Sequence, residues 1–239
     1  MKWYRPIDKW MYSRYKEIIS ISSATTENLR KYIKISCPID TISNGIDVER
    51  YSAAVPVERK NIGCKNDTFL LMMVAGFRYQ KDQDTIIRAL TLLPKNVQLC
   101  LVGDGDRRVE CKELVKRLNL EERVVFTGVR SDIPNVLKAA DVVVMSSHLE
   151  GFGLAAVEGM AAGKPVVASD VVGLRDIVKN YGCVFPQGDE RRLAEIVERL
   201  KNDSNFYKTL AGQCYLRSKD YDISKTIDSY IDVYESIVK

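Results

Sequence analysis

The sequence predicts an α/β fold: a doubly wound, Rossmann-type parallel sheet of about six strands, with helical extensions at both ends of the chain. Two observations support this prediction. From Thr68 onward, short apolar runs alternate with segments of helical period. The runs are continuously apolar, which is typical of strands buried on both faces of a parallel sheet. Ligands of such sheets bind beyond the carboxyl ends of the strands.

Composition narrows the class of protein. The 239 residues are 46% hydrophobic and 28% charged, as in ordinary soluble globular proteins, and the formal net charge is +4. This mild positive charge suits an anionic ligand but is no nucleic-acid signature, so we expect no nucleic-acid partner. No apolar run approaches the ~20 residues that span a bilayer, and Met1 is not followed by the apolar core of a signal peptide. We therefore expect a cytoplasmic protein.

The cysteines and the single histidine predict no metal site. The six cysteines are scattered, without a C-x-x-C pair, and most lie in apolar segments, which indicates reduced, buried thiols. His148 is the only histidine, and no cysteine cluster supports it as a ligand. We expect neither a metal nor another cofactor. Two interpretations of His148 are equally good: it lines a turn, or it acts as a general base.

Residues 1–34 differ from the rest of the chain. They contain both tryptophans, Trp3 and Trp10, and eight Lys or Arg residues against three acids. Interleaved basic and aromatic residues occur at membrane surfaces and on polyanion-binding proteins, which leaves open a peripheral contact with the inner face of a membrane. We favour the alternative that these aromatic residues pack over a neighbouring helix.

Local signals predict the elements between residues 18 and 67. Ile18–Ser22 is typical of a short strand, and Thr25, Thr26 and Glu27 are expected to start a helix that ends near Ile33. The Asn-Gly pair within residues 43–47 predicts a turn with a positive φ angle. Residues 52–67 are expected to form a polar linker.

The repeating unit follows the pattern of strand, turn and helix. Its expected strands are Phe69–Ala75, Val97–Val102, Val124–Phe126, Val142–Met145, Val166–Ala168 and Cys183–Phe185. Its expected helices are Asp82–Leu93, Arg107–Leu118, Ile133–Ala139, Leu154–Ala162, Leu174–Lys179 and Glu190–Lys201. Two more helical patterns, separated near residues 220–222, occupy residues 205–239. In the second, apolar residues recur along one face from Ile223 to Val238. We expect that apolar face to pack against another part of a protein.

The stretch 146–163 is the strongest candidate for a binding site. After an apolar run, the chain passes through a turn containing Gly151 and Gly153 into a helix. Such a helix start presents free backbone N–H groups and the positive end of the helix dipole, which bind phosphate. Glu150 precedes the turn. Glu158 lies on an otherwise small, apolar helix, where a carboxylate needs hydrogen-bond donors such as sugar hydroxyls.

A second candidate follows the first strand of the repeating unit. In Gly76-Phe77-Arg78-Tyr79-Gln80-Lys81, the two cations Arg78 and Lys81 are three residues apart and able to converge on one diphosphate. Taken alone, the two cations are better explained as part of an ordinary basic loop. The segment 103–105, Gly-Asp-Gly, has the beginning of a dinucleotide-binding fingerprint, but Arg108 takes the place of its third glycine. We expect a structural tight turn there.

Together these motifs resemble the donor half of the retaining glycosyltransferases of family 4, the glycosyl transferases group 1, which have the two-domain GT-B fold. The family's Glu-x7-Glu pattern is present as Glu150 and Glu158 in EGFGLAAVE. It is accompanied, in the family's order, by GFRYQK, LVGDGDRR, FTG, ADVVVMSS, GKPVVASDVVGLRDIV and a later Gly-Asp pair. Upstream, ISISSATTENL and SNGIDVERY resemble the segment that joins the family's two domains. The resemblance covers about residues 18–239.

The resemblance implies a role for each matching residue. Arg78 and Lys81 would hold the diphosphate of a nucleotide sugar, and with Glu150 against the transferred sugar they form the expected catalytic set. Glu158 would accept hydrogen bonds from the ribose hydroxyls. The other expected donor-binding residues are Gly76, Arg130, Gly151, Phe152, Gly153 and Leu154. Backbone N–H groups of Gly153 and Leu154 would face phosphate or sugar, and the backbone near Arg130 would contact the edge of the base.

Two departures from the family follow from the sequence. The family has a complete N-terminal acceptor domain, and this chain matches only its last segment. We expect residues 1–45 to be a remnant of that domain and its linker, 46–212 to be the nucleotide-sugar-binding domain, and 213–239 to pack back on the N-terminal domain or to cause self-association. The segment 173–176, Gly-Leu-Arg-Asp, also replaces the Gly-Gly and Glu that the family often carries.

The expected function is transfer of a sugar, without a metal and with retention of configuration, from a nucleotide sugar to a glycan, polysaccharide or glycolipid acceptor. This chain would carry the donor-binding half. Two alternatives remain open. A nucleotide-sugar epimerase of the same fold needs more acid–base groups than a chain with one histidine supplies. A non-catalytic subunit that binds a nucleotide sugar and needs a partner chain agrees with the missing acceptor domain.

Overall fold

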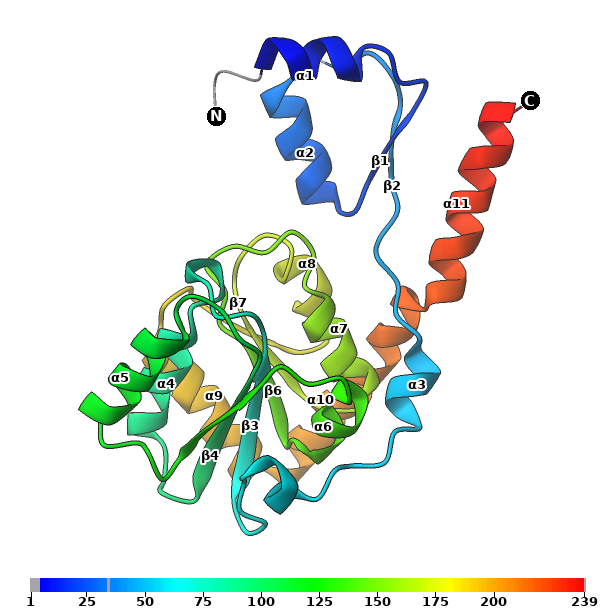
Figure 1. Cartoon of the computed structure of the whole chain (residues 1–239). Coiled ribbons are helices and arrows are strands. Elements are labelled where there is room, and N and C mark those ends of the chain that lie inside the picture. The colour runs from blue at the N-terminus through cyan, green and yellow to red at the C-terminus, as the bar shows by residue number, and fades with distance from the viewer. Residues whose placement is uncertain (1–4, 34, 239) are drawn as a thin grey trace.

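The structure is a computed structural model that describes residues 5–33 and 35–238. Two parallel sheets, one of six strands and one of two, form its framework (Figure 1). In the larger sheet the strand order is β5-β4-β3-β6-β7-β8, so the order reverses between β3 and β6. This is the topology of a doubly wound sheet, and it confirms the predicted Rossmann-type α/β fold.

The six strands lie where the sequence predicts them, with ends that differ by at most two residues. They are β3 (Phe69–Val74), β4 (Val97–Val102), β5 (Val124–Gly128), β6 (Val142–Met145), β7 (Val166–Ser169) and β8 (Cys183–Phe185). In β3, Leu70 and Met72 pack on one face of the sheet, while Leu71 and Met73 pack on the other. All four are buried, so the strand has no polar face and its sequence is continuously apolar.

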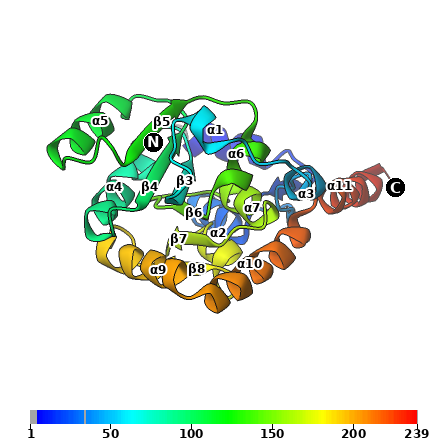
Figure 2. The same ribbon diagram turned by 90° about the horizontal axis from the view of Figure 1, so that it is seen from below.

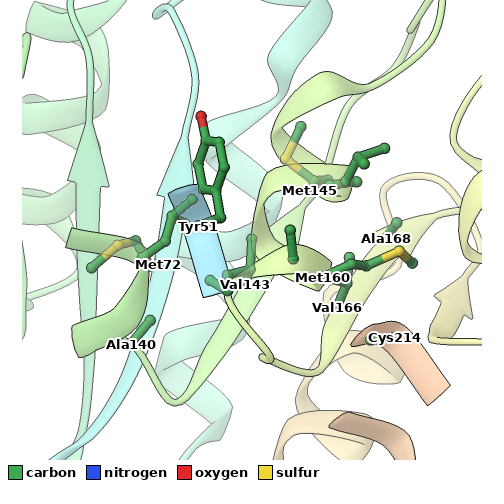
Figure 3. Packing of buried hydrophobic residues seen from close by; sticks show 14 of the residues in the cluster. Tyr51, Met72, Ala140, Val143, Met145, Met160, Val166, Ala168 and Cys214 are labelled. Atoms are coloured by element: carbon green, nitrogen blue, oxygen red, sulfur yellow. The ribbon is translucent and has the colours of Figure 1, made fainter. Parts of the chain in front are cut away.

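Helices cover both faces of this sheet (Figure 2). One face carries α4 (Gln83–Leu92), α5 (Arg108–Arg117) and α9 (Glu190–Asn202). The other carries α6 (Ile133–Ala139), α7 (Leu154–Ala161), α8 (Arg175–Val178) and α10 (Ser204–Ser218). Figure 3 shows how Met160 and Cys214 from this second layer meet the strand residues Val143, Val166 and Ala168. Each helix predicted for the repeating unit is present, with ends that differ by no more than one residue.

Residues 18–41 form a small β-α-β unit, here called the N-terminal unit, above the larger sheet in Figure 1. In it β1 (Ile18–Ser20) and β2 (Ile39–Thr41) pair in parallel, and α2 (Ser23–Tyr32) connects them. The helix starts two residues earlier than predicted because the Ser22 hydroxyl, rather than Thr25, caps it. Neither β2 nor the preceding helix α1 (Arg5–Tyr12) is predicted from the sequence pattern.

Two aromatic residues before the N-terminal unit, Trp10 and Tyr15, do not pack as expected. Trp10 is 57% exposed and Tyr15 is 48% exposed, so the prediction that they cover a helix is wrong for these two residues. The guanidinium group of Arg14 instead lies 3.9 Å from the centre of the Trp10 ring. Trp3 and Tyr4 lie outside the described residues. A membrane contact of this segment stays a prediction.

The connection between the two sheets is more ordered than a polar linker. It contains α3 (Val48–Ser52) and a short 3-10 helix, η1 (Arg59–Ile62). The guanidinium group of Arg59 donates to two backbone carbonyls and to the Asp141 carboxylate, which fastens η1 to the sheet. The buried thiol of Cys64 follows directly, and all six cysteines are free thiols, as expected.

The predicted Asn-Gly turn at residues 43–47 is not formed. The segment is an irregular connection, and Gly45 lacks the positive φ that the sequence analysis expects. Glycine is needed for another reason, because a Cβ at Gly45 would lie 2.7 Å from Ile223 Cα, at the start of α11 (Ile223–Val238). The hydroxyl of Thr226 also donates to the Ser43 carbonyl at 3.0 Å. The connection and α11 are thus in direct contact.

Helix α11 extends away from the larger sheet (Figure 1). The two predicted tail helices are present as α10 and α11, and residues 219–221 separate them. The apolar face of α11 is exposed at Ile223, Ile227, Ile231, Tyr234 and Val238. Packing of this face on an N-terminal domain, and self-association through it, stay predictions. The predicted domain division also stays a prediction, and its boundary at residue 213 lies within α10.

Two glycines within helices are expected to respond to alanine in opposite ways. A Cβ at Gly159 of α7 would lie within 3.0 Å of three carbons of Val143 in β6. We expect Gly159→Ala to destabilise the fold by roughly 1–3 kcal/mol, because overpacking outweighs the gain in helix propensity. Gly212→Ala in α10 meets open space and should stabilise by about 1 kcal/mol. Urea unfolding of both variants measures the difference, and equal shifts in the same direction would contradict the packing argument.

Candidate functional site

The loops that follow β3 and β6 meet where the strand order reverses. The buried Ser146 hydroxyl donates to the carbonyl of Asp82 at 2.7 Å. The backbone N–H of His148 donates to the carbonyl of Gln80 at 2.8 Å. These bonds hold a short 3-10 helix, η2 (Tyr79–Lys81), against the start of the β6–α7 loop. In open α/β sheets this position, beyond the carboxyl ends of the strands, is where ligands bind.

Lys81 and Glu150 form an ion pair across the two loops. Both side chains are largely buried, with 24% and 14% of their surfaces exposed. The hydroxyl of Ser147 lies 3.4 Å from the same carboxylate oxygen and supports its position. Two of the predicted catalytic residues are therefore in direct contact, although 69 residues separate them in the sequence.

The glycine turn between Glu150 and α7 has the backbone that the sequence predicts. Gly153 has a φ of 101° and caps α7 without a side-chain acceptor. Within the described chain the N–H groups of Leu154 and Ala155 make no hydrogen bond and remain available to a ligand, whereas the Ala156 N–H donates to the Gly153 carbonyl. A second glycine, Gly173 (φ 96°), lies so close to the turn that a Cβ there would be 2.9 Å from the Glu150 carbonyl carbon. Phe152 is buried, with its ring edge against Tyr221 at 5.4 Å between centroids.

A cavity of about 280 Å³ opens at this turn. Six of the predicted site residues line it: Lys81, Glu150, Gly151, Phe152, Gly153 and Leu154. Met145, at the end of β6, and Ala155 of α7 complete that side. The opposite wall comes from Ile21 of the N-terminal unit and from Asn44 of the connection. The cavity is thus built from two parts of the chain that are far apart in the sequence.

Glu158 lies one helical turn beyond the cavity. Leu154 and Ala155 line the cavity, and Glu158 is on the same face of α7 because residues three and four positions apart are neighbours on a helix. The Tyr51 hydroxyl of α3 donates to Glu158 Oε1 at 2.7 Å. Burial raises the pKa of the Glu158 carboxyl, and the hydrogen bond from Tyr51 opposes this shift. The protein itself thus supplies one of the hydrogen-bond donors that the Glu158 carboxylate needs.

Arg78 and Gly76 lie at the neighbouring β3–α4 loop. The side chain of Arg78 is exposed and makes no hydrogen bond or ion pair with the rest of the described chain. The segment 103–105 packs directly against this loop, since a Cβ at Gly105 would lie 2.9 Å from Phe77 N. Both glycines of that segment have positive φ, at 136° and 153°, which supports the predicted structural turn.

Arg130 is not brought to the cavity. It follows β5, two strands away from β3, and its guanidinium group donates to both oxygens of Asp132 at 2.8 and 2.7 Å. This bidentate contact lowers the pKa of the Asp132 carboxyl. The side chain is therefore engaged locally, which leaves the backbone near Arg130 as the group available for a base.

His148 lines the loop, as one of its two interpretations expects. Its Nδ1 lies 2.8 Å from the Gln187 amide nitrogen and 3.4 Å from the buried Asp82 carboxylate. Burial raises the pKa of Asp82, and the bonds from Thr85 and the proximity of His148 act in the opposite direction. These contacts tie the loop to α4 rather than exposing the imidazole to a substrate.

Sequence reasoning missed Ile21, Asn44 and Tyr51 as parts of the site. Each lies in an element whose local pattern carries no site signal, and only the long-range contact with the β6–α7 loop or α7 places it there. Across the described ranges, no group of three or more His, Cys, Asp or Glu side chains is arranged to hold a metal ion. None of the helices in the described part of the chain is long and apolar enough to cross a bilayer.

The chain matches a known protein family. The family model for glycosyl transferases group 1 matches residues 55–215. The Escherichia coli enzyme UDP-Gal:alpha-D-GlcNAc-diphosphoundecaprenol alpha-1,3-galactosyltransferase is 30% identical over 215 residues, covering 84% of this chain and 54% of that protein. LpsD of Rhizobium meliloti, a lipopolysaccharide core biosynthesis glycosyltransferase, is 31% identical over 201 residues, covering 82% of this chain and 57% of that protein.

A solved structure shows the same arrangement of elements. The crystal structure of Anabaena HepE in complex with UDP and glucose superposes with a TM-score of 0.89 at 26% identity, covering 97% of this chain and 66% of HepE. The chain thus spans between about half and two thirds of the length of these relatives. The matched residues 55–215 include the whole larger sheet and both loops at its switch point. The chain belongs to the glycosyl transferases group 1 family.

Proposed function

We propose that this chain is the donor-binding half of a retaining glycosyltransferase that transfers a sugar from a nucleotide sugar to a carbohydrate or lipid-linked acceptor. The observation that carries this proposal is the contact of Lys81 with Glu150 beside the uncapped N-terminus of α7. A cation and a helix start favour the diphosphate, and a carboxylate beside them suits the hydroxyl groups of a sugar. The complexes of HepE with UDP and glucose support this assignment.

In this proposal positive charge stabilises the leaving diphosphate. The bond between the sugar and the diphosphate breaks, and negative charge grows on the diphosphate as it leaves. Lys81 is held at the cavity by Glu150. Arg78 on the same loop, which has no partner among the described residues, supplies a second cation. The N-terminus of α7 adds its partial positive charge. These groups provide the electrostatic stabilisation that a metal ion supplies in other transferases.

The second carboxylate would bind the nucleotide rather than the sugar. Glu158 has one oxygen on the Tyr51 hydroxyl, which leaves the other for the ribose hydroxyls. A carboxylate is retained at this buried position despite the cost of desolvation, which favours a role in binding over one in stability. Gly76 and the backbone near Arg130 would line the path of the diphosphate and the base.

The acceptor side lies outside the larger sheet. Ile21 and Asn44 close one wall of the cavity, so the N-terminal unit faces the position proposed for the sugar. We infer that residues 1–45 belong to an acceptor-binding domain and that α11 packs on it. A chain that spans between about half and two thirds of its relatives also fits a second candidate, a nucleotide-sugar-binding subunit that requires a partner chain.

The chain by itself should bind a nucleotide sugar without appreciable transfer. Calorimetry with UDP, GDP and ADP and their glucose conjugates should give saturable binding for one nucleotide, because the donor contacts lie within residues 76–158. Adding the N-terminal part of a relative as a separate chain should restore transfer if the protein is an enzyme. Absence of binding to all six compounds would eliminate both the transferase and the binding subunit.

Glu158→Ala should weaken nucleotide affinity by roughly 1–3 kcal/mol, the range for lost hydrogen bonds to a buried charged group. Calorimetry with the nucleotide selected above measures the change. Glu198→Ala, at an exposed position of α9, is the matched control and should leave affinity unaltered. The ribose assignment is wrong if both variants bind as tightly as the parent protein.

Glu158→Gln should stabilise the folded chain at neutral pH. The raised pKa of Glu158 means that its contribution to stability is present below the ordinary carboxyl pKa of 4.5 and is lost as pH rises through the raised value. A neutral amide removes that loss and keeps the acceptor for Tyr51. Urea midpoints should therefore be higher for Glu158→Gln at pH 7.5 and equal to the parent near pH 4.5, with Glu198→Gln unchanged at both. A difference that grows toward acid pH would reverse the sign and refute the argument.

A further inference from the structure

The N-terminal unit touches the glycine turn through one buried hydroxyl. The Ser22 hydroxyl lies 3.0 Å from the carbonyl oxygen of Gly151, 129 residues away in the sequence. Ile21 packs beside it, since a Cβ at Gly151 would lie 3.8 Å from Ile21 Cδ1. One residue further, Ser23 donates to the Asp176 carboxylate at 3.2 Å. The end of β1 and the start of α2 therefore rest on the loops that form the cavity.

The hydrogen bonds of Ser22 fix the direction of this contact. Its hydroxyl lies 3.1 Å from Thr25 N, 2.8 Å from Thr25 Oγ1 and 3.0 Å from Gly151 O. A backbone carbonyl only accepts and a backbone N–H only donates, so the single Ser22 proton goes to Gly151. The Thr25 hydroxyl must then donate to Ser22. One donor and two acceptor sites are all used, and the helix cap and the contact with Gly151 depend on the same oxygen.

The Gly151 carbonyl has little else to hold it. Among the described residues, the bond from Ser22 is the one hydrogen bond made by this carbonyl. Its neighbours in the turn are fixed by other contacts: Glu150 by Lys81, and Phe152 by the ring of Tyr221. Gly151 is exposed and has no side chain, so its carbonyl is restrained by the bond from Ser22 and by the backbone of Gly173, where a Cβ would lie 3.1 Å from the Gly151 carbonyl carbon.

We propose that Ser22 is a positioning residue for the glycine turn: it holds the Gly151 carbonyl and so sets the backbone from which Glu150 reaches the transferred sugar. This inference rests on the proposed function for the identity of the ligand. The restraint itself is a property of the unliganded chain. Because Ser22 belongs to the N-terminal unit, the position of that unit is then also a determinant of donor binding.

A pair of nearly isosteric substitutions separates capping from positioning. Ser22→Asp keeps an acceptor for Thr25 N at the start of α2, where a carboxylate is favourable, but has no proton for the Gly151 carbonyl. Ser22→Asn has the same size, caps equally well and retains an N–H donor. Thr25→Val removes the hydroxyl bond to Ser22 and leaves Ser22 free to donate to Gly151. This variant controls for loss of stability in α2.

Hydrogen exchange of the unliganded full chain is the first measurement. In Ser22→Asp the amides of Ala156 and Val157, which donate to the Gly153 carbonyl at the end of the turn, should exchange about tenfold faster, the factor expected for loss of one hydrogen bond. The amides of α2 should keep their protection. Ser22→Asn should change the turn by less than about threefold, and Thr25→Val should leave it unchanged while loosening α2. Equal exchange of the turn in the Asp and Asn variants overturns the positioning role.

Donor affinity is the second measurement. Ser22→Asp should weaken binding of UDP-glucose about five- to tenfold and of UDP less than about twofold, because Glu150, the group that the turn positions, would contact the sugar that UDP lacks. An equal loss for both ligands, or an equal loss in Thr25→Val, overturns the assignment of Ser22 to the sugar site. If the parent chain binds neither ligand while exchange responds as expected, the proposed function falls and the restraint on the turn stands.

Discussion

The parallel pairing of β3 with β6 is the constraint on which the rest of the site depends. These strands are neighbours in space but not in sequence, and the strand order reverses between them. Parallel strands end at the same edge, so the loop after β3 and the loop after β6 must leave the sheet side by side. The Ser146 bond to Asp82 and the ion pair of Lys81 with Glu150 follow from that meeting. An antiparallel partner at this position would send one loop to the opposite edge.

The buried core holds these loops in place. Gly159 lets α7 lie directly on Val143 of β6, and this close contact sets the height of the helix over the sheet. The N-terminus of α7 is thereby fixed at the switch point, where Gly153 leaves its N–H groups uncapped. The same helix carries Glu158, and burial disfavours the charged form of its carboxyl group, as the raised pKa indicates. Positions that oppose folding in an otherwise apolar element are typical of binding sites, because the ligand supplies what the fold lacks.

The cavity does not belong to the larger sheet alone. Its second wall is made by Ile21 and Asn44, and Ser22 holds the turn that forms its floor. The connection between the two sheets is itself fixed, because Gly45 touches the start of α11 and Arg59 fastens η1 to the sheet. Movement of the N-terminal unit would therefore change the shape of the cavity and the orientation of the glycine turn together. The position of the N-terminal unit and the shape of the cavity are linked through these few contacts.

The strands and helices of the larger sheet are predictable from sequence patterns, because a strand buried on both faces must be apolar throughout and a helix beside it must be apolar on one side. The sequence also indicated the glycine turn with Glu150 and the loop with Lys81, since their backbone and charge requirements are local. Tertiary structure alone decided that Tyr51 binds Glu158 across 107 residues, that Asn44 lines the cavity, and that Gly45 is needed for a close approach to α11. Such contacts join elements with no shared periodicity. Which residues meet in such a contact depends on the folded chain as a whole, and no local sequence pattern predicts it.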